Sequence, residues 1–202
     1  MSTIETKPDG LIDRRTFVDH LVANRGDELC IVAGLGSPCY DLKAAGDHPL
    51  NFYLYGAMGG AVPMAMGLAA AQPEKRVMAL TGDGEVLMGL TGLAAAGAEG
   101  LENLIVVVLD NERYGETGQQ TTHTARGVNL AQTAIGLGYR AVRDIKTPDE
   151  AAELHDWIKT VQGPACAVVK ISAEAAGMAL PPQDGVYLKH RFRERLLGVQ
   201  PR

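Results

Sequence analysis

Short apolar runs alternate with segments of helical periodicity along most of this chain. Runs such as 29–33 and 104–109 are apolar at nearly every position, which is typical of strands buried on both faces of a parallel sheet. Strands of this kind need helices on both sides, so the pattern predicts an α/β fold with a parallel sheet of about six strands and helices on both faces. The expected strands are 29–33, 52–55, 77–81, 104–109, 139–142 and 165–171.

The expected helices occupy the segments between these runs. Small residues fill the stretch 60–72, which predicts a helix packed tightly against its neighbours. Thr147 and Glu150 form a capping box with Pro148 in the first helical position, so a helix begins there. The expected helices are 11–25, 60–72, 86–98, 129–137, about 147–161, and 187–197 after a pair of prolines.

The length of the chain favours one domain. It has 202 residues, of which 46% are hydrophobic, enough for one sizeable core. Because no internal repeat interrupts the pattern, we expect a single domain over 1–202, with a core at 26–175 and a C-terminal helical tail at 183–202. The basic residues of that tail are interpreted as a solvated helix face or as a contact with a partner subunit; they are Lys189, His190, Arg191, Arg193 and Arg195.

Charge and cysteine content exclude several classes of protein. The formal net charge is -5 with both signs scattered, which gives no support to a role on nucleic acid or at a membrane surface. The first ten residues are polar, and no stretch approaches the roughly 20 apolar residues of a membrane span. Three cysteines without C-x-x-C spacing indicate neither a disulfide framework nor a zinc site. A reducing cytoplasm is therefore the expected location.

Three unusual segments follow three of the expected strands. GAMGG follows 52–55, GDGE follows 77–81, and DNERYGETG follows 104–109. In parallel α/β sheets, ligands bind at the edge where the strands have their carboxyl ends. The chain is also rich in glycine, with 24 residues, which permits close approach of the backbone to a ligand. We expect the three segments to form one site.

The segment Gly82-Asp83-Gly84 suits a phosphate and a divalent cation. It lies at the start of an expected helix, where free N–H groups and the helix dipole favour an anion. A carboxylate beside a phosphate needs a bridging cation, and Mg²⁺ commonly combines protein oxygens with substrate phosphate. Asn111, at the end of the next strand, supplies a second oxygen donor. Ordinary turn formation is the alternative explanation of both GDG and Asp110-Asn111, and the spacing of Asp83 and Asn111 on adjacent strand ends makes it less favoured.

Gly82-Asp83-Gly84 followed by Asp110-Asn111 resembles the signature of thiamine diphosphate enzymes. The resemblance implies that Asp83, Asn111 and the backbone carbonyl of Arg113 hold Mg²⁺, which in turn holds the cofactor diphosphate. The family usually has a small residue after the motif, often serine, whereas this chain has Glu85. Because a diphosphate would repel that carboxylate, Glu85 is expected to turn away or to bind a partner group.

The stretch Gly56-Ala57-Met58-Gly59 is similar to a turn in the decarboxylase branch of the same family. There a bulky apolar residue forces the cofactor rings into a bent shape, which implies that Met58 is the wedge and that the Gly56 carbonyl accepts from the aminopyrimidine. A core methionine is the alternative. The cofactor-binding set implied by the resemblance is Gly56, Ala57, Met58, Gly82, Asp83, Gly84, Glu85, Asn111, Tyr114, Gly115, Glu116 and Thr117.

Two longer stretches narrow the resemblance further. NFYLYGAMG and DNERYGETGQQTTHT look like the β subunit of sulfopyruvate decarboxylases and the corresponding half of phosphonopyruvate decarboxylases. The implied activity is decarboxylation of an anionic 2-oxo acid to an aldehyde and CO₂, with Met58 and His123 as the catalytic candidates. Thr121, Thr122 and His123 are placed to meet the distal anion of the substrate, although a loop histidine is more commonly a solvated residue.

The family also requires a pyrimidine-binding domain with an activating glutamate, for which this chain has no room. The resemblance therefore implies a separate α subunit that carries this glutamate, in a hetero-oligomer with two or more copies of each chain, and activity only in that assembly. A carboligase or acyl-transferring subunit and a catalytically silent cofactor-binding module are the alternatives. A generic nucleotide-binding fold gives Asn111 no role.

Overall fold

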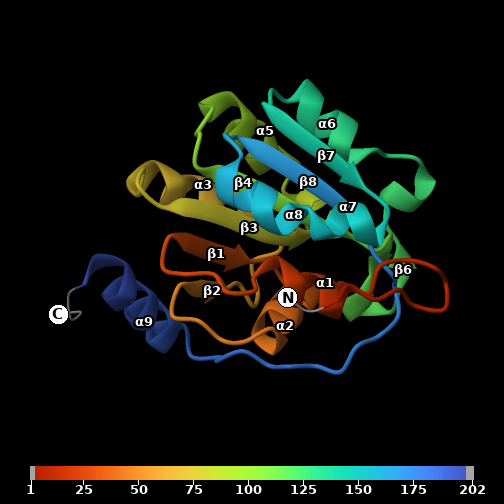
Figure 1. Cartoon of the computed structure of the whole chain (residues 1–202), viewed down its shortest axis with the longest axis horizontal. Coiled ribbons are helices and arrows are strands. Elements are labelled where there is room, and N and C mark those ends of the chain that lie inside the picture. Colours follow the sequence, from red (N-terminus) through yellow and green to blue (C-terminus); the bar gives the residue numbers. More distant parts are fainter. Residues whose placement is uncertain (1–2, 199–202) are drawn as a thin grey trace.

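A computed structural model of the chain describes residues 3–198 and contains a six-stranded parallel sheet (Figure 1). The strand order is β2-β1-β3-β4-β8-β7, and every neighbouring pair is parallel. This is the predicted architecture. The strands are β1 (Leu29–Ala33), β2 (Asn51–Tyr53), β3 (Arg76–Gly82), β4 (Leu104–Asp110), β7 (Ala141–Ile145) and β8 (Ala165–Lys170).

The apolar runs form the centre of this sheet. All residues of β1 and β4 are buried, and β3 lies between these two strands. Leu80 of β3 is paired in register with Ala33 on one side and Val107 on the other. Near-continuous apolar sequence is required here because side chains on both faces of the sheet are covered by helices.

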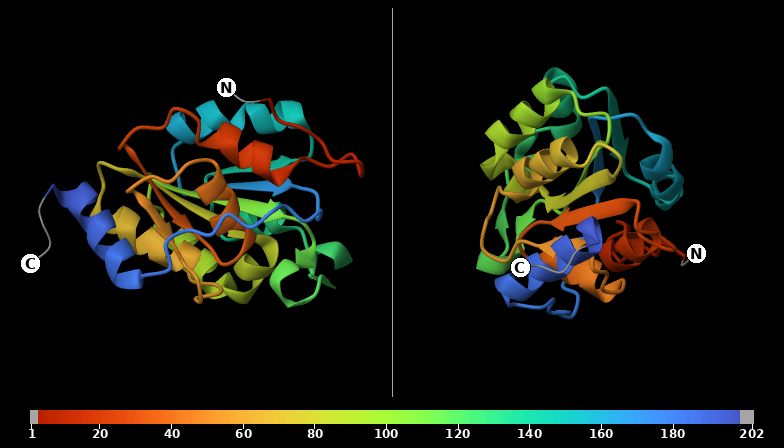
Figure 2. Two further views of the ribbon diagram at one scale, coloured as in Figure 1. Left: turned by 90° about the horizontal axis from the view of Figure 1, so that it is seen from below. Right: turned by 90° about the vertical axis from the view of Figure 1, so that its left-hand side faces the viewer.

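Helices cover both faces (Figure 2). One apolar cluster joins the sheet to α1, α2, α7 and α8, and the other joins it to α3, α5 and α6. The helices are α1 (Arg14–Leu21), α2 (Ser37–Ala44), α3 (Ala61–Ala71), α4 (Asp83–Met88), α5 (Leu90–Glu99), α6 (Leu130–Gly136), α7 (Pro148–Ala152), α8 (Leu154–Thr160) and α9 (Gly185–Leu197). Among residues 3–198, no helix is long and apolar enough to cross a membrane.

The structure departs from the sequence prediction in local elements. Helix α2 was not predicted, and the single helix expected at 86–98 is two helices, α4 and α5, that meet at Gly89. The helix expected to run from Thr147 to about residue 161 likewise divides into α7 and α8 at Glu153. A small antiparallel pair, β5 (Arg113–Tyr114) and β6 (Gln120–Thr121), with the short 3-10 turns 115–117 and 124–126, was also missed.

Helix α9 packs against the edge strand β2. The rings of Phe192 and Phe52 meet edge to face, with their centroids 5.8 Å apart. Arg191 donates to Asp47 Oδ2 at 2.7 Å, and Arg195 donates to Asp27. The interpretation of the basic residues as a solvated face is therefore wrong for Arg191, whose side chain is only 12% exposed, because sequence periodicity cannot locate the acids contributed by distant segments. Arg195 stays exposed, as expected for a solvated face. Residues 199–202 of the expected tail lie outside the described residues.

A buried ion pair fixes α1 against α2. Asp41 of α2 is fully buried and accepts from Arg14 and Arg15 of α1, both at 2.8 Å. Burial raises the pKa of Asp41, and the two guanidinium groups oppose that rise. A charge in this position is stable only while it is paired.

Asp41→Ala is expected to lower the free energy of unfolding by about 3–5 kcal/mol, since it leaves the buried Arg14 without its carboxylate. The matched control is Glu102→Ala, which removes the exposed pair with Arg140 and should cost less than about 1 kcal/mol. Urea unfolding followed by circular dichroism measures both. Equal stability of the two variants would contradict a structural role for the buried pair.

Candidate functional site

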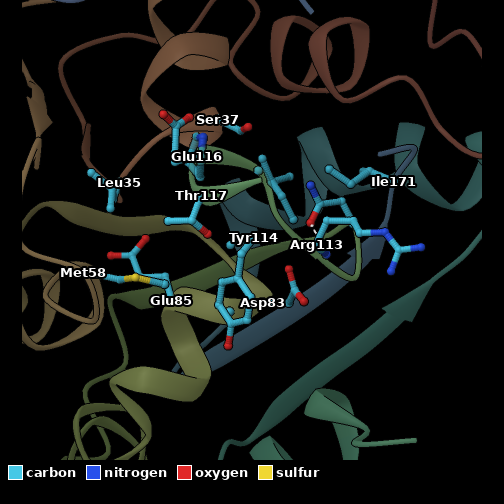
Figure 3. A pocket seen from close by; sticks show the side chains of 16 residues that line it. Leu35, Ser37, Met58, Asp83, Glu85, Arg113, Tyr114, Glu116, Thr117 and Ile171 are labelled. Carbon is cyan, nitrogen blue, oxygen red and sulfur yellow. Dashed lines mark hydrogen bonds between the residues drawn. The ribbon is translucent and has the colours of Figure 1, made fainter. Parts of the chain in front are cut away.

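The three unusual segments meet at the carboxyl edge of the sheet, as predicted. They line one hollow with a cavity volume of about 110 Å³ (Figure 3). The lining residues are Leu35, Ser37, Pro38, Met58, Gly82, Asp83, Gly84, Glu85, Leu109, Asn111, Arg113, Tyr114, Gly115, Glu116, Thr117 and Ile171.

Asp83 is one of two buried carboxylates in the lining of this pocket. It is the first residue of α4, only 1% exposed, and its Oδ2 accepts from Thr122 at 2.5 Å and from Thr124 at 2.9 Å. Burial raises the pKa of Asp83, the charge of Asp110 raises it further, and the two hydroxyl groups lower it. A cation beside Asp83 would relieve this cost of burial, because an opposite charge favours the ionised form.

Asn111 and Arg113 line the same pocket from the turn after β4. Glu112 between them has a positive φ of 59°, which reverses the chain, and Asn111 Oδ1 accepts from the backbone N–H of Arg113 at 2.9 Å. The Arg113 side chain extends away from Asp83 (Figure 3). Its backbone is therefore the part that is available to the pocket.

The glycines of the GDG motif permit close packing. A Cβ on Gly84 would collide with the ring of Tyr114, which lies against this turn. Tyr114 belongs to the loop that also contributes Gly115, Glu116 and Thr117 to the lining. Gly84 therefore allows the loop after β4 to lie directly over the start of α4.

Glu85 lines the pocket, and its carboxylate is buried in the protein. The side chain is 4% exposed, and its Oε2 accepts from the Thr81 hydroxyl at 2.9 Å. Burial raises its pKa, whereas Thr81 and the backbone N–H groups of Ala61, Gly59 and Leu35 lower it. Its other oxygen, Oε1, is buried and makes no regular hydrogen bond within residues 3–198.

Met58 is half-buried and lies beside Glu85 in the pocket wall (Figure 3). Gly56 and Ala57 precede it in the same turn, are exposed, and do not line the pocket. The pocket thus joins Met58 to Asp83, although it receives only one residue of the predicted Gly56–Met58 group.

The predicted substrate contacts lie elsewhere. Thr122 is 1% exposed and is bonded to Asp83, so it is not available to a substrate. Thr121 and His123 are exposed and are absent from the pocket lining. The expectation failed for Thr122 because the loop folds back onto the carboxylate of Asp83, and the pocket geometry gives no support to a catalytic role for His123.

Sequence reasoning missed the wall formed by Leu35, Ser37 and Pro38. These residues connect β1 to α2, and Ser37 is the first residue of that helix. Gly34 and Gly36 around a strand end, followed by a proline in the first helical turn, were the available signal.

Among the described residues, no cluster of three or more His, Cys, Asp or Glu could hold a metal by itself. The pocket instead offers the carboxylates of Asp83, Glu85 and Glu116, the amide of Asn111 and a backbone turn, on an α/β sheet. The fold and the pocket together define a cofactor-binding α/β domain whose ligand lies at the carboxyl edge of the sheet.

The chain belongs to the thiamine pyrophosphate enzymes. Residues 36–170 match the family described as thiamine pyrophosphate enzyme, C-terminal TPP binding domain, so the cofactor of this domain is thiamine diphosphate. The sulfopyruvate decarboxylase subunit beta of Methanocaldococcus jannaschii is 33% identical, over 91% of this chain and 96% of that protein. Its counterpart from Methanothermobacter thermautotrophicus is also 33% identical, over 94% and 98%.

Two longer proteins resemble the chain over part of their length. The phosphonopyruvate decarboxylase of Streptomyces viridochromogenes is 31% identical, over 89% of this chain but 45% of that protein. The crystal structure of benzoylformate decarboxylase from Polynucleobacter necessarius superposes with a TM-score of 0.70 at 19% identity, over 88% of this chain and 36% of that one. The structural match shows the shared fold.

Proposed function

We propose that the chain is the diphosphate-binding subunit of a thiamine diphosphate-dependent decarboxylase. Its substrate would be an anionic 2-oxo acid of the sulfopyruvate or phosphonopyruvate type, converted to an aldehyde and CO₂. The observation that carries this proposal is the joining of Met58 and Asp83 in one pocket, in a chain similar over nearly its whole length to sulfopyruvate decarboxylase β subunits.

The cofactor would be held through Mg²⁺ by Asp83, Asn111 and the backbone carbonyl of Arg113. Carboxylate, amide and carbonyl oxygens are ligands that Mg²⁺ accepts, and the burial of Asp83 supports a cation at this position. When bound, thiamine diphosphate supplies the nucleophilic carbon and the electron sink for loss of the carboxylate. The residues of this chain would anchor the diphosphate at the GDG turn and hold the rings over Met58.

A separate pyrimidine-domain α subunit would complete the site with its activating glutamate. The name subunit beta on the relatives that match over nearly their whole length supports a partner. We propose a hetero-oligomer with two or more copies of each chain. The three free, buried cysteines support a reducing cytoplasmic location.

The substrate class is tested on the assembled enzyme by measuring CO₂ release. Sulfopyruvate and phosphonopyruvate are expected to react, whereas pyruvate should react at least about tenfold more slowly, because it lacks the distal anion and the binding energy that this anion supplies. Equal rates on all three would contradict an anion-selective pocket. Consumption of a 2-oxo acid with formation of a new carbon–carbon bond would assign the carboligase alternative instead.

Met58→Ala is expected to lower kcat by about 100-fold while cofactor affinity stays near the normal value. The diphosphate anchor at Asp83 is untouched, but the reacting atoms are misplaced when the support under the rings is removed, and small misplacements have effects of this size. Steady-state kinetics and calorimetric titration of the assembled enzyme give the two values. Normal turnover would mean that Met58 only fills space in the core.

A further inference from the structure

Glu85 is the position at which this chain departs from its family motif, and the pocket gives that departure a use. The residue lies near the start of α4, two positions after Asp83, and its carboxylate is directed toward the turn that carries Met58 (Figure 3). Only 4% of the surface of Glu85 is exposed. A buried carboxylate of this kind needs partners in defined places.

The surroundings of Glu85 come from three strand ends. The Thr81 hydroxyl of β3 donates to Oε2 at 2.9 Å. A Cβ on Gly34, just after β1, would overlap the carboxylate, so Gly34 provides the space that it fills. The carboxylate lies beside the Met58 side chain in the wall of the pocket (Figure 3). Thr81 thus holds one carboxylate oxygen, and the other, Oε1, is buried without a regular hydrogen bond among the described residues.

A second contact supports the same turn from the other end of α4. A Cβ on Gly89 would lie 2.5 Å from the carbonyl oxygen of Gly59 and 2.8 Å from its Cα, so the two backbones touch. Gly59 has a positive φ of 86°, which keeps the turn close to the helix. The Met58 turn is therefore in contact with α4 at Glu85 near its start and at Gly89 at its end, while Asp83 begins the helix.

We propose that Glu85 is a positioning residue that, together with Gly89, fixes the Met58 turn on helix α4 and so sets the separation between Met58 and Asp83. The inference rests on the proposed function, in which Asp83 anchors one end of the cofactor and Met58 supports the other. Release of the turn should misplace the reacting atoms without loosening the anchor.

Glu85→Gln in the assembled enzyme is the first test, with Glu99→Gln at the exposed end of α5 as the control. The carboxamide removes the charge and leaves one oxygen acceptor in place of two, which weakens the contact with Thr81 and the Met58 turn. We expect kcat to fall about 10- to 100-fold. Thiamine diphosphate affinity at saturating Mg²⁺ should change less than about threefold. Hydrogen exchange in the peptide spanning 56–61 should become faster, whereas Glu99→Gln should leave all three values unchanged.

Gly89→Ala tests the second contact and remains informative if Glu85→Gln does not fold. The φ of Gly89 is −95°, which alanine adopts freely, so its effect comes from collision with Gly59. It should give the same loss of kcat with retained cofactor affinity. Loss of cofactor affinity in step with kcat in both variants would overturn the inference, and so would normal kcat in both.

The Met58→Ala variant separates this inference from the proposed function. If Met58→Ala is slow and both Glu85→Gln and Gly89→Ala are normal, the positioning role alone fails. If Met58→Ala is itself normal, the wedge in the proposed function fails. If Glu85 acts through Met58, adding Glu85→Gln to Met58→Ala should lower kcat by less than about threefold relative to Met58→Ala alone.

Discussion

The purified chain alone is expected to decarboxylate 2-oxo acids at least about 1,000-fold more slowly than the assembled enzyme. Its pocket offers an anchor for the diphosphate at Asp83 and a support at Met58, but the proposed activating glutamate belongs to another subunit. Acid–base groups of that kind contribute about 10² to 10⁴ to a rate, and an incomplete site also admits water. CO₂ release from sulfopyruvate, measured with and without a pyrimidine-domain subunit, gives the ratio.

The control for this experiment is a partner whose activating glutamate is replaced by glutamine. It should assemble with the chain and bind the cofactor, but it should not restore turnover. Full activity of the chain without a partner would contradict the division of the site between two subunits. An assembly that binds cofactor and never releases CO₂ from any 2-oxo acid would favour the silent module.

Asp83→Ala and Asn111→Ala are each expected to weaken Mg²⁺-dependent binding of thiamine diphosphate by more than about 100-fold, or about 2.7 kcal/mol. Both side chains line the pocket, and Asp83 supplies a buried carboxylate next to the helix terminus. Removal of either would leave the diphosphate without its bridge to the protein. Calorimetric titration of the assembled enzyme with and without Mg²⁺ measures the effect.

Asp144→Ala is the matched control for the metal site. Asp144 is exposed and lies near the carboxyl end of β7, outside the pocket. Its carboxylate pairs with Lys146 at 2.9 Å. It should bind cofactor normally. Unchanged affinity in both Asp83→Ala and Asn111→Ala would refute the metal assignment, and a change in only one would identify the dominant ligand.

The strands and the motif-bearing loops were predictable because their signals are local. Five apolar residues in a row at 29–33 can only be covered on both faces, and the structure buries all of them. The capping box at Thr147 and Glu150 is likewise formed within four residues, and both of its hydrogen bonds are present. Strands that all run parallel bring their carboxyl ends to one edge, which is why the three loops could be expected to share a pocket.

Errors arose where distant backbone decided the local structure. The helix expected at 86–98 breaks at Gly89 because that residue lies against Gly59, which is 30 positions earlier in the chain. Thr122 was expected at the substrate and instead donates to Asp83. Neither contact leaves a periodic trace in the sequence, so no pattern of hydrophobic and polar positions could reveal it.

The sequence by itself determined the parallel sheet, the edge that holds the site and the family to which the chain belongs. These follow from periodicity and from a motif whose spacing reflects two adjacent strand ends. Only the tertiary structure decided the direction of the Glu85 carboxylate and the support of the Met58 turn on α4. The physical reason is that burial and hydrogen-bond partners depend on which segments meet in space, and Gly34, Thr81 and Gly59 are far apart along the chain.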